Sequence, residues 1–310
     1  MSLGIGIIGA GVMGADHART ITRLTAGAHI TAVSDADLAR ARSIAEETGA
    51  KRAEADPHAI IRDPEVGAVL IASPDRTHAD LVLACLEAGK PVLCEKPLAP
   101  TPEDCLRVIE AEVAGRRRMV QVGFMRRFDP AYAEMKRILS GGKLGRPLLF
   151  HCVHRNAVPP AFFEAGMLIT NAAVHEVDVA RWLLDSQVVS ARVIRSSSSE
   201  AAYRDLMLIV LENEAGNLIS IEIFMKASYG YDIRGEVVCE HGTVVLAPPV
   251  NTRVRHAGAE AFSLTSDWRG RFADAYRLQL QEWVRALAAG RTVGASAWDG
   301  YAATAVAAAC

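Results

Sequence analysis

The chain has 310 residues, about twice the usual length of one domain, so two domains are expected. Half of its residues are hydrophobic and 23% are charged, which is typical of a soluble globular protein with a sizeable core. The net charge of -2 and the lack of a basic block disfavour a nucleic-acid partner. No apolar run reaches the roughly 18 residues of a membrane span, and no signal-peptide pattern opens the chain. We therefore expect a cytoplasmic protein without a membrane partner.

The six cysteines are scattered along the chain without a CxxC pair. This spacing favours reduced thiols over a disulfide framework. His151, Cys152 and His154 lie close together in the sequence, but on a strand residues 151 and 154 point to opposite faces. No HExxH motif occurs either, so no metal is expected.

An apolar run at residues 5–8 leads into Gly9-Ala10-Gly11-Val12-Met13-Gly14, and a helix-like segment follows at 16–25. In such a strand–GxGxxG–helix unit, the first glycine permits a tight turn and the second lets backbone approach a pyrophosphate. The third lets helix and strand pack closely, and the helix N-terminus offers N–H groups to the phosphates. The pattern predicts a dinucleotide site rather than a purely structural turn.

The second strand, expected at residues 30–33, is followed by Ser34-Asp35, and Asp35 lies 21 positions after Gly14. A carboxylate at this point can accept hydrogen bonds from both adenosine-ribose hydroxyls and would repel a 2′-phosphate. Asp35 therefore favours NAD over NADP. Arg40 and Arg42 lie nearby, but we expect both on the solvated face of the next helix.

Strands and helices continue to alternate up to residue 122, which predicts a parallel, doubly wound sheet and a Rossmann domain over residues 1–122. Further helices are expected at 39–47, 78–88 and 102–114, and further strands at 69–72, 92–94 and 120–122. Ligands of such sheets bind at the carboxyl ends of the strands. Three loops should therefore converge on one crevice: residues 9–14, Ser73-Pro74-Asp75 and Glu95-Lys96-Pro97. Lys96 directly follows a buried strand and precedes a rigid proline, which favours a functional role over mere solubility.

Residues 123–310 follow a different pattern and are assigned to one α+β domain. Strand-like runs with short turns predict a mainly antiparallel sheet, covered on one face by helices. These strands are expected at 148–154, 188–194, 205–211, 218–224, 234–239 and 243–246, and the helices at 130–139, 171–184, 271–289 and 297–309.

The expected helix at 171–184 carries three polar residues on one stripe. Asn171, His175 and Asp178 lie at positions i, i+4 and i+7, beside a stripe of apolar residues that can be buried. A helix that lines a cleft shows such a pair of stripes. A solvated helix face with chance spacing explains the pattern equally well.

Three motifs together resemble the Gfo/Idh/MocA oxidoreductases: the glycine motif, Ala72-Ser73-Pro74-x-x-x-His78, and Cys94-Glu95-Lys96-Pro97-Leu98. The segments at 126–130, 151–156, 175–178, 229–232 and 296–301 are similar to the inositol 2-dehydrogenase branch of that family. The resemblance covers essentially the whole chain. It implies the cofactor NAD, a small polyol or sugar substrate, and a C-terminal α/β domain that binds substrate and whose open sheet forms a homo-oligomer, a tetramer in this branch.

The resemblance also implies roles for single residues. Lys96 would contact the reacting hydroxyl, Pro97 would hold the turn, and His175 would accept the proton. The polyol pocket would be lined by Met125, Arg126, His154, Asn156, Asn171, His175 and Tyr231. The cofactor would be held by Gly9, Gly11, Val12, Met13, Gly14, Asp35, Ser73, Pro74, His78, Glu95 and Lys96.

The chain departs from this branch at one catalytic position. The inositol enzymes usually carry an aspartate four residues before the catalytic histidine, followed by a small hydroxyl residue, whereas this chain has Asn171 and Ala172. Asparagine can orient the imidazole ring but adds no charge to stabilise an imidazolium. Compared with the inositol enzymes, this departure implies either a change in catalytic efficiency or a different substrate.

The implied activity is the NAD-dependent oxidation of myo-inositol to 2-keto-inositol (inosose) by hydride transfer. Two alternatives stay open. One is a related dehydrogenase that acts on scyllo-inositol, an aldose or a sugar derivative. The other is a dinucleotide-sensing regulator without turnover, which would need neither Lys96 nor His175.

Overall fold

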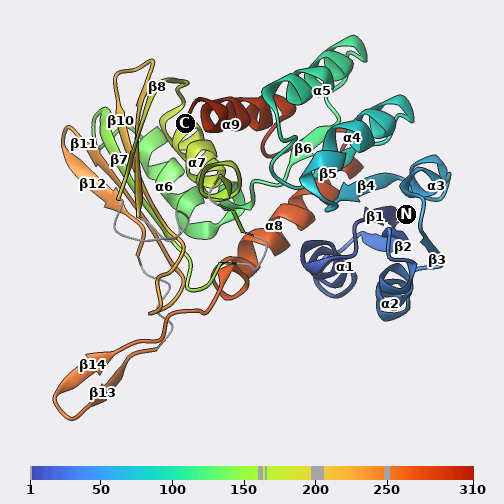
Figure 1. Cartoon of the computed structure of the whole chain (residues 1–310), viewed down its shortest axis with the longest axis horizontal. Helices are drawn as coiled ribbons and strands as arrows, with labels where there is room; N and C mark the ends of the chain where they lie inside the picture. Colours follow the sequence, from blue (N-terminus) through green and yellow to red (C-terminus); the bar gives the residue numbers. More distant parts are fainter. Residues whose placement is uncertain (1, 160–162, 165, 197–205, 248–251) are drawn as a thin grey trace. The chain divides into compact units, whose positions relative to one another are not determined.

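The structure is a computed structural model that describes residues 2–159, 163–164, 166–196, 206–247 and 252–310. The chain forms two compact units (Figure 1). The first unit contains Met1–Phe128 and Asp274–Ala305, and the second contains Asp129–Ala273 and Val306–Cys310. The expected division after residue 122 differs from this partition, because residues 274–305 return to the first unit.

A six-stranded parallel sheet organises the first unit, as predicted. The strand order is β3-β2-β1-β4-β5-β6, so the order reverses between β1 and β4. In open parallel sheets, this reversal places a ligand crevice at the carboxyl ends of the two strands. The strands are β1 (Leu3–Ile8), β2 (Ala28–Ser34), β3 (Arg52–Glu54), β4 (Ala68–Ile71), β5 (Val92–Cys94) and β6 (Val120–Val122).

Helices cover both faces of this sheet, with α1 and α2 on one face and α4 and α5 on the other (Figure 1). Local sequence explains where they begin: Asp37 caps α2 through the N–H groups of Ala39 and Arg40, and Thr101 caps α5 ahead of a proline. The helices are α1 (Val12–Leu24), α2 (Leu38–Thr48), α3 (Pro57–Arg62), α4 (His78–Glu87) and α5 (Pro102–Ala114), with the 3₁₀ turns η1 (Asp75–Thr77) and η2 (Met125–Phe128).

The helix that returns to the first unit is α8 (Trp268–Ala288), which is irregular at Phe272. Its later turns bury Trp283, Leu280 and Val284 in the hydrophobic core around β1 and α1. The side-chain amide of Gln281 accepts a hydrogen bond from the N–H of Ala26 at 2.9 Å and donates one to its carbonyl at 3.1 Å. These contacts explain why residues far along the chain belong to the first unit. The helix α9 (Ala297–Ala309) follows.

The second unit is built on a six-stranded sheet of order β12-β11-β7-β10-β9-β8. It is mainly antiparallel, as predicted, but β7 and β10 pair in parallel. The strands are β7 (Pro147–Arg155), β8 (Val188–Arg195), β9 (Met207–Asn213), β10 (Leu218–Phe224), β11 (Asp232–Cys239) and β12 (Gly242–Val245). The predicted start of β9 at Asp205 lies outside the described residues.

Two helices, α6 (Pro130–Ser140) and α7 (Val174–Leu184), lie on one face of this sheet (Figure 1). Burial alternates along β7 in agreement with one covered face. Phe150, Cys152 and His154 are buried, whereas His151 is exposed. His151 and His154 therefore face opposite sides, as predicted.

Four short elements were not expected from the sequence: β3, α3 and the hairpin strands β13 (Val254–His256) and β14 (Ala259–Ala261). Each strand has only three residues, which is too short for a clear alternation of apolar and polar side chains. The helix α1 also begins earlier than predicted, at Val12, because it starts directly after its N-cap Gly11.

The predicted helix at 171–184 is wrong in its first turn. Asn171 lies in η3 (Leu168–Ala173), a π-helical segment, and regular α-helix begins at Val174. The wider turn at 168–173 departs from the regular α-helical spacing between Asn171 and the stripe of His175 and Asp178. The solvated-face interpretation is wrong as well, because residues 174–181 are all buried.

All six cysteines are free thiols, and every one except Cys310 is buried. Burial raises the pKa of the Cys85 thiol to about 12. Within the described residues, no helix is long and apolar enough to cross a bilayer.

Candidate functional site

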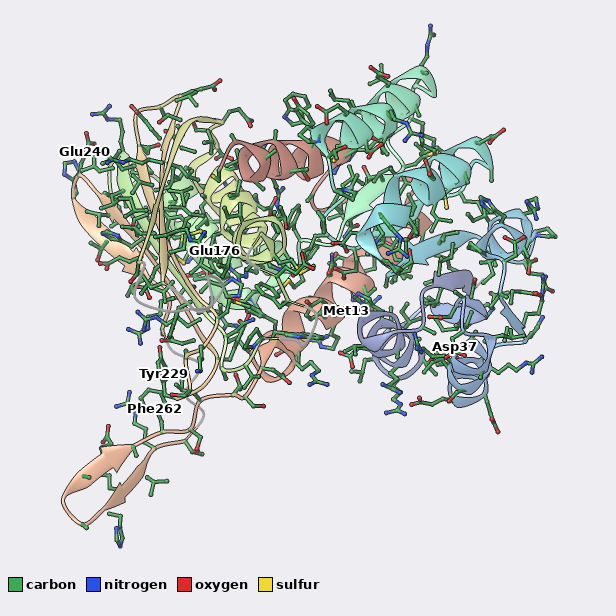
Figure 2. All side chains as sticks on the ribbon, viewed as in Figure 1. Met13, Asp37, Glu176, Tyr229, Glu240 and Phe262 are labelled. Carbon is green, nitrogen blue, oxygen red and sulfur yellow. The ribbon has the colours of Figure 1, made fainter. Side chains whose placement is uncertain are left out.

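The loop between β1 and α1 has the geometry that the glycine motif predicts. Gly9 has φ +94°, and a Cβ on Gly14 would lie 1.7 Å from the Gly9 carbonyl oxygen. Both positions therefore require glycine. A Cβ on Gly11 would meet no atom within 4 Å, so this backbone is open on its side-chain side. Gly11 caps α1 without a side-chain hydrogen bond, which leaves the N–H groups of the first turn, around Met13 (Figure 2), available to an anion.

Asp35 lies beside this loop at the end of β2. One carboxylate oxygen accepts a hydrogen bond from the N–H of Ala10 at 2.7 Å, and the other accepts one from Asp37 at 2.9 Å. This places the carboxylate where the adenosine ribose is predicted. Arg40 is exposed, as expected, yet its Nη1 atom lies 3.6 Å from an Asp35 oxygen.

His78 joins the second and third loops of the predicted crevice. It opens α4, and its ring is buried. Its Nδ1 atom lies 2.8 Å from the carbonyl oxygen of Pro97, and its Nε2 atom lies 2.9 Å from that of Ser73. The ring thus contacts the backbone of both loops, and direct contact of His78 with the cofactor stays a prediction.

The turn after β5 contains Lys96, which is half-buried, and Glu95, which is buried. The Glu95 carboxylate accepts a hydrogen bond from Nε2 of His17 at 2.7 Å and one from the N–H of Lys96 at 3.2 Å. Burial alone would raise the pKa of Glu95, but the His17 hydrogen bond and the charges of His17 and Lys96 outweigh burial and lower it. Glu95 is therefore an anion at neutral pH, with its charge directed at His17.

Met125 and Arg126 lie in η2, directly after the last strand of the first sheet. Both are buried. The N–H of Gly123 donates to the carbonyl of Cys94 at 2.7 Å, which ties this segment to the residue before Glu95. The two residues thus lie in the first unit, at the same sheet edge as Lys96, and their contact with a polyol stays a prediction.

The second unit gathers four of the predicted substrate residues. The ring of His154 lies 6.4 Å from that of His175 and 6.1 Å from that of Tyr231, measured between centroids. Its Nε2 atom lies 3.2 Å from the side-chain oxygen of Asn156. These residues come from β7 and its end, from α7 and from the residue before β11, so residues distant in sequence form one cluster.

A carboxylate completes this cluster on its inner side. Glu176, labelled on α7 in Figure 2, is 1% exposed and lies 3.1 Å from Nδ1 of His154. A buried carboxylate beside one ring nitrogen fixes the orientation of the imidazole. His154 is thus held by Glu176 at one nitrogen and faces Asn156 with the other.

Sequence reasoning missed His17 and Glu176. Both could have been suspected from the sequence, because each is an ionisable residue whose apolar neighbours predict burial. Buried ionisable groups are usually paired, so a partner would then be expected. His17 directly precedes Ala18 on the buried face of α1, and Glu176 follows His175 in α7. Their partners could not be read from spacing alone, because they lie 78 and 22 residues away.

The first unit fits a dinucleotide by three independent features. The backbone at Gly11 is open, the first turn of α1 lacks a side-chain cap, and Asp35 stands at the end of β2. Pyrophosphate would be held by the helix N-terminus, and ribose by Asp35. The further cofactor contacts expected of Val12, Ser73 and Pro74 stay predictions.

Comparison with known proteins gives matches over both halves of the chain. Residues 3–124 match an oxidoreductase family described as an NAD-binding Rossmann fold, and residues 136–310 match the C-terminal alpha/beta domain of that family. Inositol 2-dehydrogenase 1 of Saccharopolyspora erythraea is 57% identical over 314 residues, a match that covers 100% of this chain and 93% of that protein.

Solved structures agree with these matches. A myo-inositol dehydrogenase from Lactobacillus casei, in complex with NAD(H) and myo-inositol, is 32% identical with a TM-score of 0.96, covering 100% of this chain and 94% of that one. A scyllo-inositol dehydrogenase from the same organism, with NAD(H) and scyllo-inositol, shares the fold at 22% identity and a TM-score of 0.92, covering 100% and 96%. Because both halves match one family and its relatives align over the full chain, this protein belongs to the Gfo/Idh/MocA oxidoreductases, whose N-terminal domain binds NAD.

Proposed function

We propose that this protein oxidises one secondary hydroxyl of myo-inositol to the ketone, with NAD as the hydride acceptor. The cluster of His154, Asn156, His175 and Tyr231 in the second unit carries the proposal. Several hydrogen-bonding side chains gathered in one cluster suit a ring of hydroxyls rather than an apolar substrate. The Saccharopolyspora and Lactobacillus relatives, named for inositol and myo-inositol, support the same substrate class.

The chemistry needs a base and a cation, because an alcohol proton is too weakly acidic to leave unaided at neutral pH. In the proposed mechanism, His175 accepts the hydroxyl proton while the Lys96 ammonium stabilises the negative charge that develops on oxygen. Bound NAD supplies the acceptor for the hydride. His154 and Asn156, with Met125, Arg126 and Tyr231, recognise the rest of the ring.

Asn171 gives this mechanism its distinctive feature. With an amide in place of the usual carboxylate, the imidazolium of His175 gains no opposite charge from this position. Lys96 then contributes a larger share of the electrostatic stabilisation. Asn171 stays a catalytic residue in the proposal, because its amide can still orient the imidazole ring.

The direct test is the turnover of Lys96→Ala and His175→Ala, followed through NADH absorbance with a panel of polyols and sugars. Each substitution should lower turnover with myo-inositol by at least about 100-fold, the scale of general acid–base catalysis. For His175→Ala, which changes no predicted cofactor contact, NAD affinity measured by titration should remain close to that of the parent. Near-normal turnover of His175→Ala would contradict the assignment of His175 as the base.

The same panel separates the alternatives when Asn171→Asp is included. If the amide only weakens His175, the new carboxylate should raise turnover with myo-inositol several-fold. No gain, together with strong activity on scyllo-inositol, an aldose or a sugar derivative, would identify that compound class as the substrate. Tight NAD binding with no turnover across the panel would indicate a dinucleotide sensor.

We further infer that the protein is a homotetramer of the cytoplasm. In Figure 1, the helices α6 and α7 lie on one face of the second sheet, and no drawn helix lies on the other. That face carries half-buried Val153, Leu208 and Val210, which suit contact with a second copy. The six free thiols suit a reducing compartment. Light scattering should give four times the chain mass of 33.3 kDa, and a monomer would contradict the assembly.

A further inference from the structure

Lys96 stands between two residues that are each held by a buried histidine of the first unit. On its N-terminal side, the Glu95 carboxylate accepts the 2.7 Å hydrogen bond from His17. On its C-terminal side, the carbonyl oxygen of Pro97 lies 2.8 Å from Nδ1 of His78. Both histidines are 1% exposed, so water does not compete with either ring for its hydrogen-bond partner.

The two histidines tie this turn to the other loops of the nucleotide edge. His17 lies in α1, the helix that begins at the glycine loop. His78 opens α4 and contacts the carbonyl of Ser73 through its second ring nitrogen at 2.9 Å. The turn that carries Lys96 is therefore linked to the glycine loop on one side and to the Ser73 loop on the other.

Packing around Glu95 restricts the turn further. A Cβ on Gly123 would lie 3.0 Å from the Glu95 carboxyl group, so this side chain fills the space next to that backbone. The N–H of Glu95 donates to the carbonyl of Ile71 at 2.8 Å. The ring of Tyr276 packs edge-on against that of His17, with 5.7 Å between the ring centroids. The residues that flank Lys96 are thus fixed by side-chain, backbone and ring contacts.

We propose that His17 and His78 form a clamp that positions Lys96, as positioning residues rather than catalytic ones. The clamp rests on the proposed function, in which the Lys96 ammonium stabilises charge on the substrate oxygen. Charge stabilisation depends on placement, and a shift of about 1 Å can cost on the order of 100-fold in rate. A long, flexible lysine reaches one position reliably only when its own backbone is fixed.

The clamp is tested by His17→Leu and His78→Leu, each made in the parent and in Lys96→Ala. In the parent, each should lower kcat by about 10-fold or more. For His17→Leu, which changes none of the predicted cofactor contacts, the Kd for NAD should change by less than about 3-fold. In the Lys96→Ala background, the same substitutions should lower kcat by less than about 2-fold, because residues that act through Lys96 lose their effect without it. Equal losses in both backgrounds would overturn the clamp.

A second readout follows Lys96 without turnover. In the NAD-free protein, acetylation of Lys96 by acetic anhydride, quantified by mass spectrometry against the exposed Lys51, should change several-fold when either histidine is replaced. A faster acetylation would show that the Lys96 ammonium has become more exposed. A slower one would show that it has become more buried. An unchanged Lys96 rate in both variants would contradict the clamp.

Conservative variants and a matched control protect the test against simple unfolding. His17→Gln can still donate to Glu95 and should recover much of the kcat lost in His17→Leu, even if the leucine variant folds poorly. Asp63→Asn weakens the ion pair between the buried Asp63 and the partly exposed Arg52, in the same unit but away from the Lys96 turn. It should lower the free energy of unfolding but leave kcat unchanged.

The proposed function and the clamp fail in different ways. If Lys96→Ala turns over like the parent, the role of Lys96 is wrong. If Lys96→Ala loses activity while His17→Leu and His78→Leu keep theirs, the clamp alone is wrong.

Discussion

Asp35 has a structural role in the glycine loop beside its predicted role in cofactor binding. Its carboxylate already accepts hydrogen bonds from Ala10 and Asp37, so its position beside the glycine loop is fixed before any ribose arrives. The same charge would repel a 2′-phosphate, which is the predicted basis of the preference for NAD. Arg40 is exposed and lies 3.6 Å from this carboxylate and 3.6 Å from that of Asp37.

Asp35→Ser should therefore turn a repulsive site into one that tolerates NADP. The substitution removes the repulsion of a 2′-phosphate and one of the two acidic partners of Arg40, so the guanidinium can pair with the phosphate. The ratio of kcat/KM for NAD to kcat/KM for NADP should fall by at least about 10-fold, which corresponds to about 1.4 kcal/mol. Addition of Arg40→Ser to this variant should reverse much of the gain with NADP. A ratio that stays at the parent value would show that Asp35 does not set the preference.

At the residue scale, the glycine motif and Asp35 were predicted from local spacing, whereas the polyol-pocket residues were implied by the family resemblance. The glycines at 9, 11 and 14 and Asp35 lie where the motif requires, and His154, Asn156, His175 and Tyr231 do come together in one unit. The pairs His17–Glu95 and His154–Glu176 were not predicted. Each joins residues from separate elements, so only the packed fold reveals it.

At the scale of single elements, predictions succeeded where a capping residue and a long periodic segment agree, as in α5 with Thr101 and Pro102. They failed where geometry departs from the regular period. The π-helical turn η3 carries Asn171, and no local sequence signal distinguishes it from the α-helix that follows at Val174.

The start of β11 carries a pH-dependent contribution to stability. Asp232 accepts hydrogen bonds from Tyr229 and Arg234, each at 2.7 Å. Burial alone would raise the pKa of Asp232, but these bonds outweigh it and lower the pKa below its ordinary 3.8. A lowered pKa in the folded state stabilises the protein above pH 3.8, and this contribution disappears as the pH falls through the lowered value.

Asp232→Asn should accordingly lower the free energy of unfolding at pH 7, and its difference from the parent should shrink as the pH falls below about 4. Urea titrations at a series of pH values measure this difference. Asp185→Asn is the control, because Asp185 is 77% exposed in its pair with Lys136 and should change stability little at any pH. A difference that is constant with pH would contradict the linkage.

At the scale of the whole molecule, the sequence predicted two domains of the right classes but not the full membership of the first unit. Residues 274–305 follow the second sheet in the chain, and only the burial of Trp283 and Leu280 against α1 and β1 shows where α8 belongs. Amphipathic periodicity tells that a helix has a buried face, but not which core receives it.

In the proposed reaction, NAD accepts a hydride directly from a ring carbon of myo-inositol. The most direct measurement uses myo-inositol deuterated at the carbon that is oxidised, with mass spectrometry of the NADH formed. The parent should form NADH with one deuterium per molecule of ketone, and His175→Ala and Lys96→Ala should form this labelled NADH much more slowly. Unlabelled NADH, or no NADH from myo-inositol although NAD binds, would contradict direct hydride transfer from myo-inositol to NAD.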